Sequence, residues 1–87
     1  MHKLDPRLNA VRPDLADLRL QGQVEASRFA EGQVMQVAEP VISVHKAPRF
    51  DGMQLTQALL GETVRVFDEQ EGWAWVQLEA DGYVGHV

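Results

Sequence analysis

The chain has 87 residues, a formal net charge of −5 and no cysteine. A chain of this length is expected to form one domain with a thin core. The lack of cysteine excludes a disulfide scaffold, a cysteine-ligated zinc site and a thiol nucleophile. Its apolar runs are far shorter than the roughly 20 residues of a membrane span. The start at Met1 has no apolar signal segment, which predicts a cytoplasmic protein.

Charge is divided unevenly along the chain. Residues 1–50 hold seven Lys/Arg and six Asp/Glu, a net of +1, whereas residues 51–87 hold seven Asp/Glu against Arg65, a net of −6. Nucleic acids and anionic membranes are bound by basic surfaces, so we expect neither as a partner. The acidic half is either a solvated, solubilising face or a rim that selects a cationic group on a ligand.

Residues 1–22 are predicted to form an N-terminal arm with one short helix. Pro13 suits the first helical position, and Gly22 ends the helix. Asp14 and Asp17 lie where the helix dipole favours anions. The leucines expected to pack against the following sheet are Leu15, Leu18 and Leu20.

Residues 23–87 are predicted to form a small all-β barrel of short strands about ten residues apart. Pro40 suits a sheet edge, a bulge or the first residue of a strand. Residues 54–60 show no clean strand pattern, so we expect an excursion there that leads back into the sheet. The predicted strands are a hairpin-like pair at 24–29 and 33–37, then 41–44, 63–67, 73–78 and a closing strand at 83–87 that is expected to continue past the chain.

The strand at 73–78 has two different faces, because successive side chains of a strand point to opposite sides. We expect the first face to point into the barrel. That face carries Ala74, Val76 and Leu78, and the other carries Trp73, Trp75 and Gln77.

No catalytic constellation is found. The histidines His2, His45 and His86 lack the spacing of a metal motif, and the latter two are predicted to be half-buried strand or loop residues. Ser27 and Ser43 lie outside any nucleophile motif, and the glycines are dispersed at turns. We therefore expect a chain that is not an enzyme by itself and that binds no metal or cofactor.

Aromatic side chains offer a better indication of function. They cluster around loops and one strand face, where an aromatic ring is a candidate platform for a ligand. The alternative is that Trp73 or Trp75 covers a barrel end or packs on the N-terminal arm, as a small core requires. The sequence leaves both open. The residues concerned are Phe50, Trp73, Trp75 and Tyr83.

Residues 33–87 resemble the bacterial SH3-like domain, in the variant found at the N-terminus of NlpC-type cysteine peptidases of the dipeptidyl-peptidase VI kind. The stretches 4–7 and 12–16 look like the lead-in of such proteins. His86 stands where the family usually has an aromatic residue. The motifs that carry the resemblance are Thr56-Gln-Ala-Leu-Leu-Gly-Glu62, Val64-x-Val66, Gly72-Trp73 and Asp81-Gly-Tyr-Val-Gly85.

The resemblance implies an SH3-like barrel whose turns need Gly61, Gly72 and Gly82. The residues expected to face its interior are Val64, Val66, Ala74, Val76, Leu78 and Val84.

The resemblance also implies a parent protein that cleaves murein peptides between γ-D-glutamyl and a diamino acid, with its catalytic Cys and His in a downstream domain. This chain would wall one side of the active-site cleft and help recognise the free amino end of the peptide. Two other hypotheses stay open: a general peptide-binding module of the proline-rich-ligand kind, and a purely structural domain that docks the catalytic domain or a second copy. The candidate contacts are Trp73, Trp75 and Tyr83 as apolar platforms, with Asp51 or Asp81 as a carboxylate for an amine.

Overall fold

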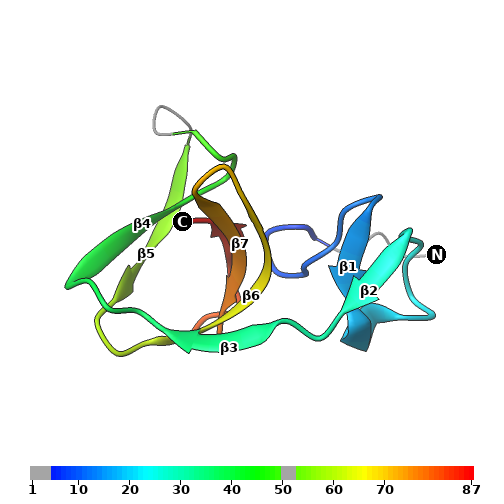
Figure 1. The fold of residues 1–87 in the computed structure, drawn as a ribbon, viewed down its shortest axis with the longest axis horizontal. Coiled ribbons are helices and arrows are strands. Elements are labelled where there is room, and N and C mark those ends of the chain that lie inside the picture. The colour runs from blue at the N-terminus through cyan, green and yellow to red at the C-terminus, as the bar shows by residue number, and fades with distance from the viewer. Residues whose placement is uncertain (1–4, 50–52) are drawn as a thin grey trace.

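A computed structural model describes residues 5–49 and 53–87 (Figure 1). Within these ranges, six strands joined by antiparallel ladders form one sheet that curls into a small barrel, in the order β3-β6-β7-β8-β4-β5. The prediction of a mainly β chain with an SH3-like barrel is confirmed. The strands are Gln33–Gln36 (β3), Val41–His45 (β4), Gln54–Leu59 (β5), Thr63–Gln70 (β6), Trp73–Leu78 (β7) and Val84–His86 (β8).

Residues 5–30 form an N-terminal lobe beside the barrel (Figure 1). In the lobe, β1 (Leu15–Asp17) pairs in parallel with β2 (Arg28–Ala30). The connection between them begins with a 3₁₀ helix, Leu18–Leu20. No helix in the described part of the chain is long and apolar enough to cross a membrane. The predicted boundary between arm and barrel after residue 22 stays a prediction.

The short helix predicted in the arm is found as a single 3₁₀ turn, Leu18–Leu20, but its predicted start at Pro13 is wrong, because that segment forms β1. All three residues of β1 are buried. Three consecutive buried residues are typical of a strand that is covered on both faces, whereas an amphipathic helix buries only one face. Asp17 ends the strand and caps the turn, since its carboxylate accepts the backbone N–H of Arg19 at 2.9 Å. Of the three leucines expected to be buried, Leu15 is buried, Leu20 is half-buried and Leu18 is exposed.

The hairpin-like pair predicted at 24–29 and 33–37 is also wrong. β2 pairs with β1, whereas β3 pairs with β6 in the barrel. Gly32 turns the chain from the lobe into the barrel with φ +80°, and a Cβ there would lie 2.5 Å from Cγ of Arg65. A glycine is therefore needed at this junction both for the positive φ and for the close approach.

The excursion predicted at 54–60 is in fact the strand β5. It forms a ladder with β4 in which Ile42 lies opposite Ala58 and Val41 opposite Leu59. The alternation was hidden because the last strand residue, Leu59, is exposed although it is apolar. Pro40 immediately precedes β4, as a proline at a strand entrance should.

Aliphatic side chains fill the inside of the barrel, which we call the barrel core. Val76 and Leu78 of β7 are almost fully buried in it, and Ala74 packs against it, so the predicted inward face of this strand is confirmed. The buried members are Val37, Val44, Ala58, Val64, Val76 and Leu78.

A second cluster, which we call the shared core, lies between the lobe and the outer face of the barrel. Val84 belongs to it, so the prediction that Val84 faces the barrel interior is wrong. The reason is register: Val84 lies opposite Gln77 and therefore shares the outer face of the sheet. The lobe contributes Ala10 and Leu15, and the barrel contributes Phe67, Trp75 and Val84.

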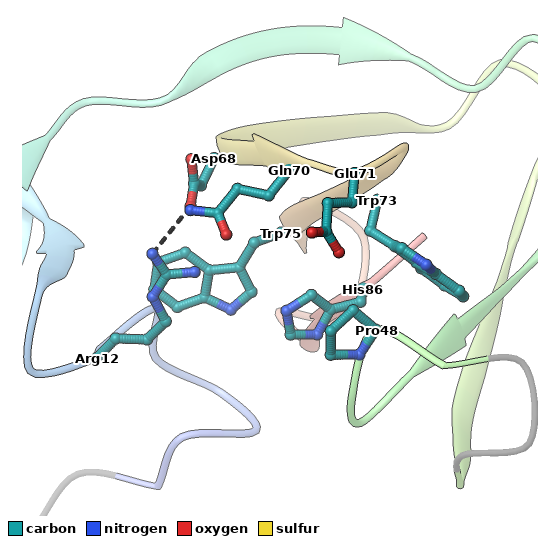
Figure 2. A pocket seen from close by; sticks show the side chains of 8 residues that line it. All are labelled: Arg12, Pro48, Asp68, Gln70, Glu71, Trp73, Trp75 and His86. Atoms are coloured by element: carbon teal, nitrogen blue, oxygen red, sulfur yellow. Dashed lines mark hydrogen bonds and ion pairs between the residues drawn. The ribbon is translucent and has the colours of Figure 1, made fainter.

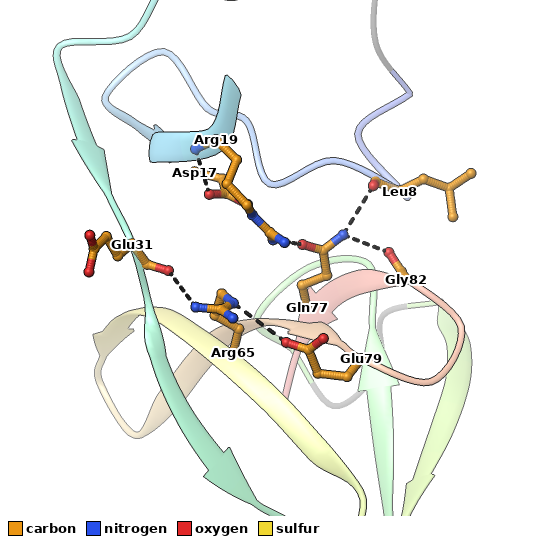
Figure 3. A network of polar contacts seen from close by, with 8 residues as sticks. All are labelled: Leu8, Asp17, Arg19, Glu31, Arg65, Gln77, Glu79 and Gly82. Carbon is orange, nitrogen blue, oxygen red and sulfur yellow. Dashed lines mark hydrogen bonds and ion pairs between the residues drawn. The ribbon is translucent and has the colours of Figure 1, made fainter. Parts of the chain in front are cut away.

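Polar contacts fasten the lobe beside the shared core (Figure 3). Gln77 of β7 donates from Nε2 to the carbonyl oxygens of Leu8, at 3.1 Å, and Gly82, at 3.0 Å. Its Oε1 accepts from Nη2 of Arg19 at 3.1 Å, and Arg19 is itself held by the buried carboxylate of Asp17. Because these partners come from the lobe and from the β7–β8 turn, the amide of Gln77 on β7 joins the lobe to the barrel.

Candidate functional site

A cleft of about 190 Å³ opens beside the end of the β6–β7 hairpin (Figure 2). Arg12 reaches it from the lobe, and Pro48 borders it from the segment after β4. The other lining side chains are Asp68, Gln70, Glu71, Trp73, Trp75 and His86.

Trp73 and Trp75 lie on the same outer face of β7, two residues apart, but in different surroundings. Trp75 is 5% exposed and packs against Phe67, with ring centroids 5.8 Å apart. Trp73 is half-buried and meets the ring of His45 edge-on, at 5.6 Å between centroids and 89° between planes. Trp75 is therefore a core residue that lines the inner end of the cleft, while Trp73 keeps part of its surface open.

Arg12 neutralises one of the two carboxylates in the cleft. Its Nη2 lies 2.9 Å from Oδ2 of Asp68 and 2.8 Å from Oδ2 of Asp14, and its guanidinium lies 4.4 Å from the ring centroid of Trp75. Burial opposes the charge of Arg12, but the hydrogen bonds that Arg12 donates to Asp14 and Asp68 outweigh it and raise the pKa of Arg12. The cation–π contact and the ion pair hold the lobe against β6 and β7.

The two-residue turn between β6 and β7 holds Glu71 in an unusual conformation. Glu71 has φ 52° and Gly72 φ 81°, the two positive values of a type I′ hairpin turn. Glu71 is the non-glycine residue with positive φ in the described ranges, and this conformation costs roughly 1–3 kcal/mol. Its carboxylate extends into the cleft between Trp75, Trp73 and His86 (Figure 2).

His86 closes the cleft from β8. It lies directly opposite His45 in the β4–β8 ladder, and both residues are half-buried as predicted. The Nδ1 atom of each is buried and makes no hydrogen bond with the described residues. Burial, followed by the nearby charge of Arg12, lowers the pKa of His86. At neutral pH this imidazole is therefore uncharged.

Comparison with known proteins identifies the family. The model of the bacterial dipeptidyl-peptidase SH3 domain matches residues 44–87, just over half of the chain. The chain belongs to this SH3 family. Its domains are non-catalytic modules of peptidases, and the match covers β5 to β8 with the whole β6–β7 hairpin. No curated protein and no solved structure matches the chain.

In this SH3 domain the residues that the sequence suggested as ligand contacts are not all together. Trp73 and Trp75 line the cleft. Tyr83 instead packs against the barrel core, and Asp81 is exposed in the β7–β8 turn, where its Oδ1 accepts the N–H of Tyr83 at 3.1 Å. Asp51 lies outside the described residues.

Five charged or polar residues of the SH3 cleft were missed, among them Gln70. Asp68, Glu71 and His86 belong to the barrel, and Arg12 comes from 56 residues before Asp68. A signal for Asp68 was present: a two-residue turn at Glu71–Gly72 places Asp68 opposite Trp75, as the ladder shows. Nothing in the sequence near Arg12 indicates its distant partner. Among the described residues, no group of three or more His, Cys, Asp or Glu could hold a metal ion.

Proposed function

We propose that this SH3 domain is the N-terminal module of a cytoplasmic, NlpC-type cysteine peptidase of the dipeptidyl-peptidase VI kind, which cleaves murein peptides between γ-D-glutamyl and a diamino acid. The family match supports a peptidase parent, and the motifs between Thr56 and Gly85 support the narrower assignment. In this proposal the catalytic Cys and His lie in a downstream domain, since this chain has no cysteine.

The module's role in this proposal is to wall one side of the active-site cleft and to select the free amino end of the peptide. The observation that carries it is the carboxylate of Glu71, which has no partner among the described residues and lies beside the half-buried ring of Trp73. A volume of about 190 Å³ is below the roughly 300–1,000 Å³ of complete ligand pockets. The cleft therefore suits one end of a peptide, with the rest of the site supplied by the catalytic domain.

Glu71 is a better partner for an ammonium group than the other cleft carboxylate. Asp68 already receives Arg12 at 2.9 Å and Nε2 of Gln70 at 3.1 Å. Glu71 makes no hydrogen bond or ion pair with the described residues that would compete with a ligand. The uncharged imidazole of His86 adds no positive charge at neutral pH, so an ammonium group at Glu71 would meet no repulsion from His86.

The parent peptidase tests this proposal with two substrates, L-Ala-γ-D-Glu-diaminopimelate with a free amino end and the same peptide N-acetylated. We expect Glu71→Gln to lower kcat/KM about tenfold on the free-amine peptide, as loss of a charge-assisted hydrogen bond does, and to leave the acetylated peptide unchanged.

Glu39→Gln is the matched control, because it removes the same charge from an exposed position outside the cleft. We expect it to leave both substrates unaffected. An equal effect of Glu71→Gln on the two peptides, or none on either, would show that the cleft does not select the amino end.

A second candidate function is binding of proline-rich peptides. It is favoured by the combination of Trp73 with acidic side chains in one cleft, which SH3 grooves of that kind use. Titration of the 87-residue chain with a Pro-x-x-Pro peptide that carries an arginine distinguishes the two. Peptide-induced changes in the amide NMR signals around position 73 that occur in the natural chain, but not in Trp73→Ala, would favour this function over the first.

A further inference from the structure

Strand β5 is an unprotected edge of the barrel sheet. It stands last in the strand order, and among the described residues its ladder is with β4. Edge strands of native proteins are usually blunted by charges, prolines or short length. β5 has six residues without a charge or a proline, and no charged residue occurs between Asp51 and Glu62. No described strand pairs with its outer backbone edge, which can therefore accept another strand.

Apolar side chains add to this open edge at the end of β5. Val41 of β4 and Leu59 of β5 lie opposite each other, 47% and 53% exposed, and Leu60 is 62% exposed. The N–H of Leu60 donates to the carbonyl of Pro40 at 3.1 Å, so these residues form one corner. Exposed apolar groups beside an unpaired edge are typical of an interface.

The other edge strand, β3, is a weaker candidate. It has four residues, and the chain enters it directly from β2, so the lobe lies at its N-terminal end (Figure 1). A pairing strand would meet the lobe there. β5 lies on the side of the barrel away from the lobe, where nothing in the described structure blocks its edge.

The two ends of β5 differ in charge. Glu62 comes three residues after the strand, and Glu39 precedes Pro40, whose carbonyl accepts the N–H of Leu60 at 3.1 Å. At the other end the N–H of Lys46 donates to the carbonyl of Met53 at 2.8 Å, which puts an exposed lysine beside the start of β5. By sequence, the segment 46–53 carries Lys46 and Arg49 against Asp51, a net of +1.

We propose that β5 pairs with β5 of a second copy of this chain, antiparallel about a twofold axis that passes beside Gln57, so that Gln57 lies opposite Gln57 of the second copy. An antiparallel pair sets the acidic end of one strand against the basic end of the other, twice, and a twofold interface is the commonest closed assembly. Leu59 of each copy then lies opposite Leu55 of its partner copy. The sheet continues from one barrel into the next through backbone hydrogen bonds.

This pairing does not rest on the proposed function, because β5 contributes no side chain to the cleft. A contact of one strand and one corner from each copy is small, and each copy carries a net charge of −5. We therefore expect a weak, concentration-dependent dimer of the low-area class.

Sedimentation velocity of the 87-residue chain over about a hundredfold range of concentration tests the pairing. We expect a monomer–dimer equilibrium for the natural chain. Gln57→Lys should raise the dissociation constant at least about tenfold, because it places a lysine beside its own symmetry mate. The matched control is Gln36→Lys, the same substitution at an exposed glutamine of β3, which should leave the equilibrium unchanged.

Hydrogen exchange of the natural chain locates the interface. Exchange of the β5 amides should slow as concentration rises, while that of the β3 amides should not. A chain that stays monomeric throughout the range would overturn the proposal, as would dissociation by Gln36→Lys in place of Gln57→Lys. A monomeric chain whose β5 amides are protected within the parent peptidase would show that another strand covers the edge.

Discussion

The two cores lie on opposite faces of the same β6–β7 hairpin, and they are closed in different ways. The barrel core is aliphatic and is sealed by the sheet curling on itself. The shared core contains Trp75 and Phe67 and is sealed by Ala10 and Leu15 from the lobe. An outer-face aromatic of a small barrel is thus a core residue where the lobe covers it, as at Trp75, and is only half-buried where the lobe ends, as at Trp73.

The largest expected effect separates the two tryptophans. Trp75→Ala should lower the free energy of unfolding by about 3–5 kcal/mol, because it empties the centre of the shared core and removes the ring under Arg12. Trp73→Ala should lower it by about 1 kcal/mol, since its ring is half-exposed. Urea unfolding followed by circular dichroism measures both. Equal losses of stability in the two variants would contradict the assignment of Trp75 to the shared core and of Trp73 to the half-buried surface.

The next effect tests whether the lobe is part of the folded unit. Leu15→Ala should lower the free energy of unfolding by about 2–4 kcal/mol, because Leu15 is buried in the shared core. Leu18→Ala, at an exposed leucine of the same lobe, should change it by less than about 0.5 kcal/mol. If Leu15→Ala left the urea midpoint unchanged, the lobe would rest on a barrel that is stable without it.

A smaller effect concerns the clamp across the shared core. Arg12→Met keeps a long side chain but loses the ion pair with Asp68 and the cation over Trp75. We expect a loss of about 1 kcal/mol, the size of a partly exposed ion pair plus a cation–π contact. Arg28→Met, at an exposed arginine of the lobe, is the control and should be near neutral. If urea unfolding showed a larger loss of stability for Arg28→Met than for Arg12→Met, this role of Arg12 would be contradicted.

The smallest effect is a pH dependence at His86. Its folded-state pKa is lowered, first by burial and then by the charge of Arg12, so the unfolded chain takes up this proton more readily. The stability it contributes is present above the unfolded pKa of about 6.5 and is lost as the pH falls from there toward the folded pKa. Urea midpoints between about pH 8 and pH 5 should fall in the natural chain and fall less in His86→Phe. A larger fall in the variant would contradict this assignment.

Much of the barrel could be predicted because its information is local. The strands at 63–67 and 73–78 show period-two patterns, and the positive φ expected at Gly61, Gly72 and Gly82 is found. The lobe could not be predicted, since β1 and β2 are three residues long and are stabilised by their pairing and by the barrel. β5 was missed for a related reason: its exposed edge and its apolar end give no alternation to read.

The candidate site divides in the same way. Trp73 and Trp75 could be found because aromatic residues on the outer face of a strand stand out. The role of Glu71 depends on a backbone angle, and the neutralisation of Asp68 depends on Arg12, which is far away in the sequence. A pattern of residue types carries neither kind of information.

The hydrogen bond from the N–H of Val84 to the carbonyl of Arg7, 2.7 Å long, sets an order on folding. It joins positions 77 residues apart, so the contact of the lobe with the barrel is completed only after β8 has been synthesised, and the shared core, which includes Val84, closes around Trp75 only then. Closing so long a loop costs conformational entropy before any long-range contact offsets that cost. This step is therefore slow, on the millisecond-to-second scale typical of small β barrels. Until then Trp75 and Phe67 are exposed together on the nascent hairpin, and this interval is when the chain is most prone to aggregate.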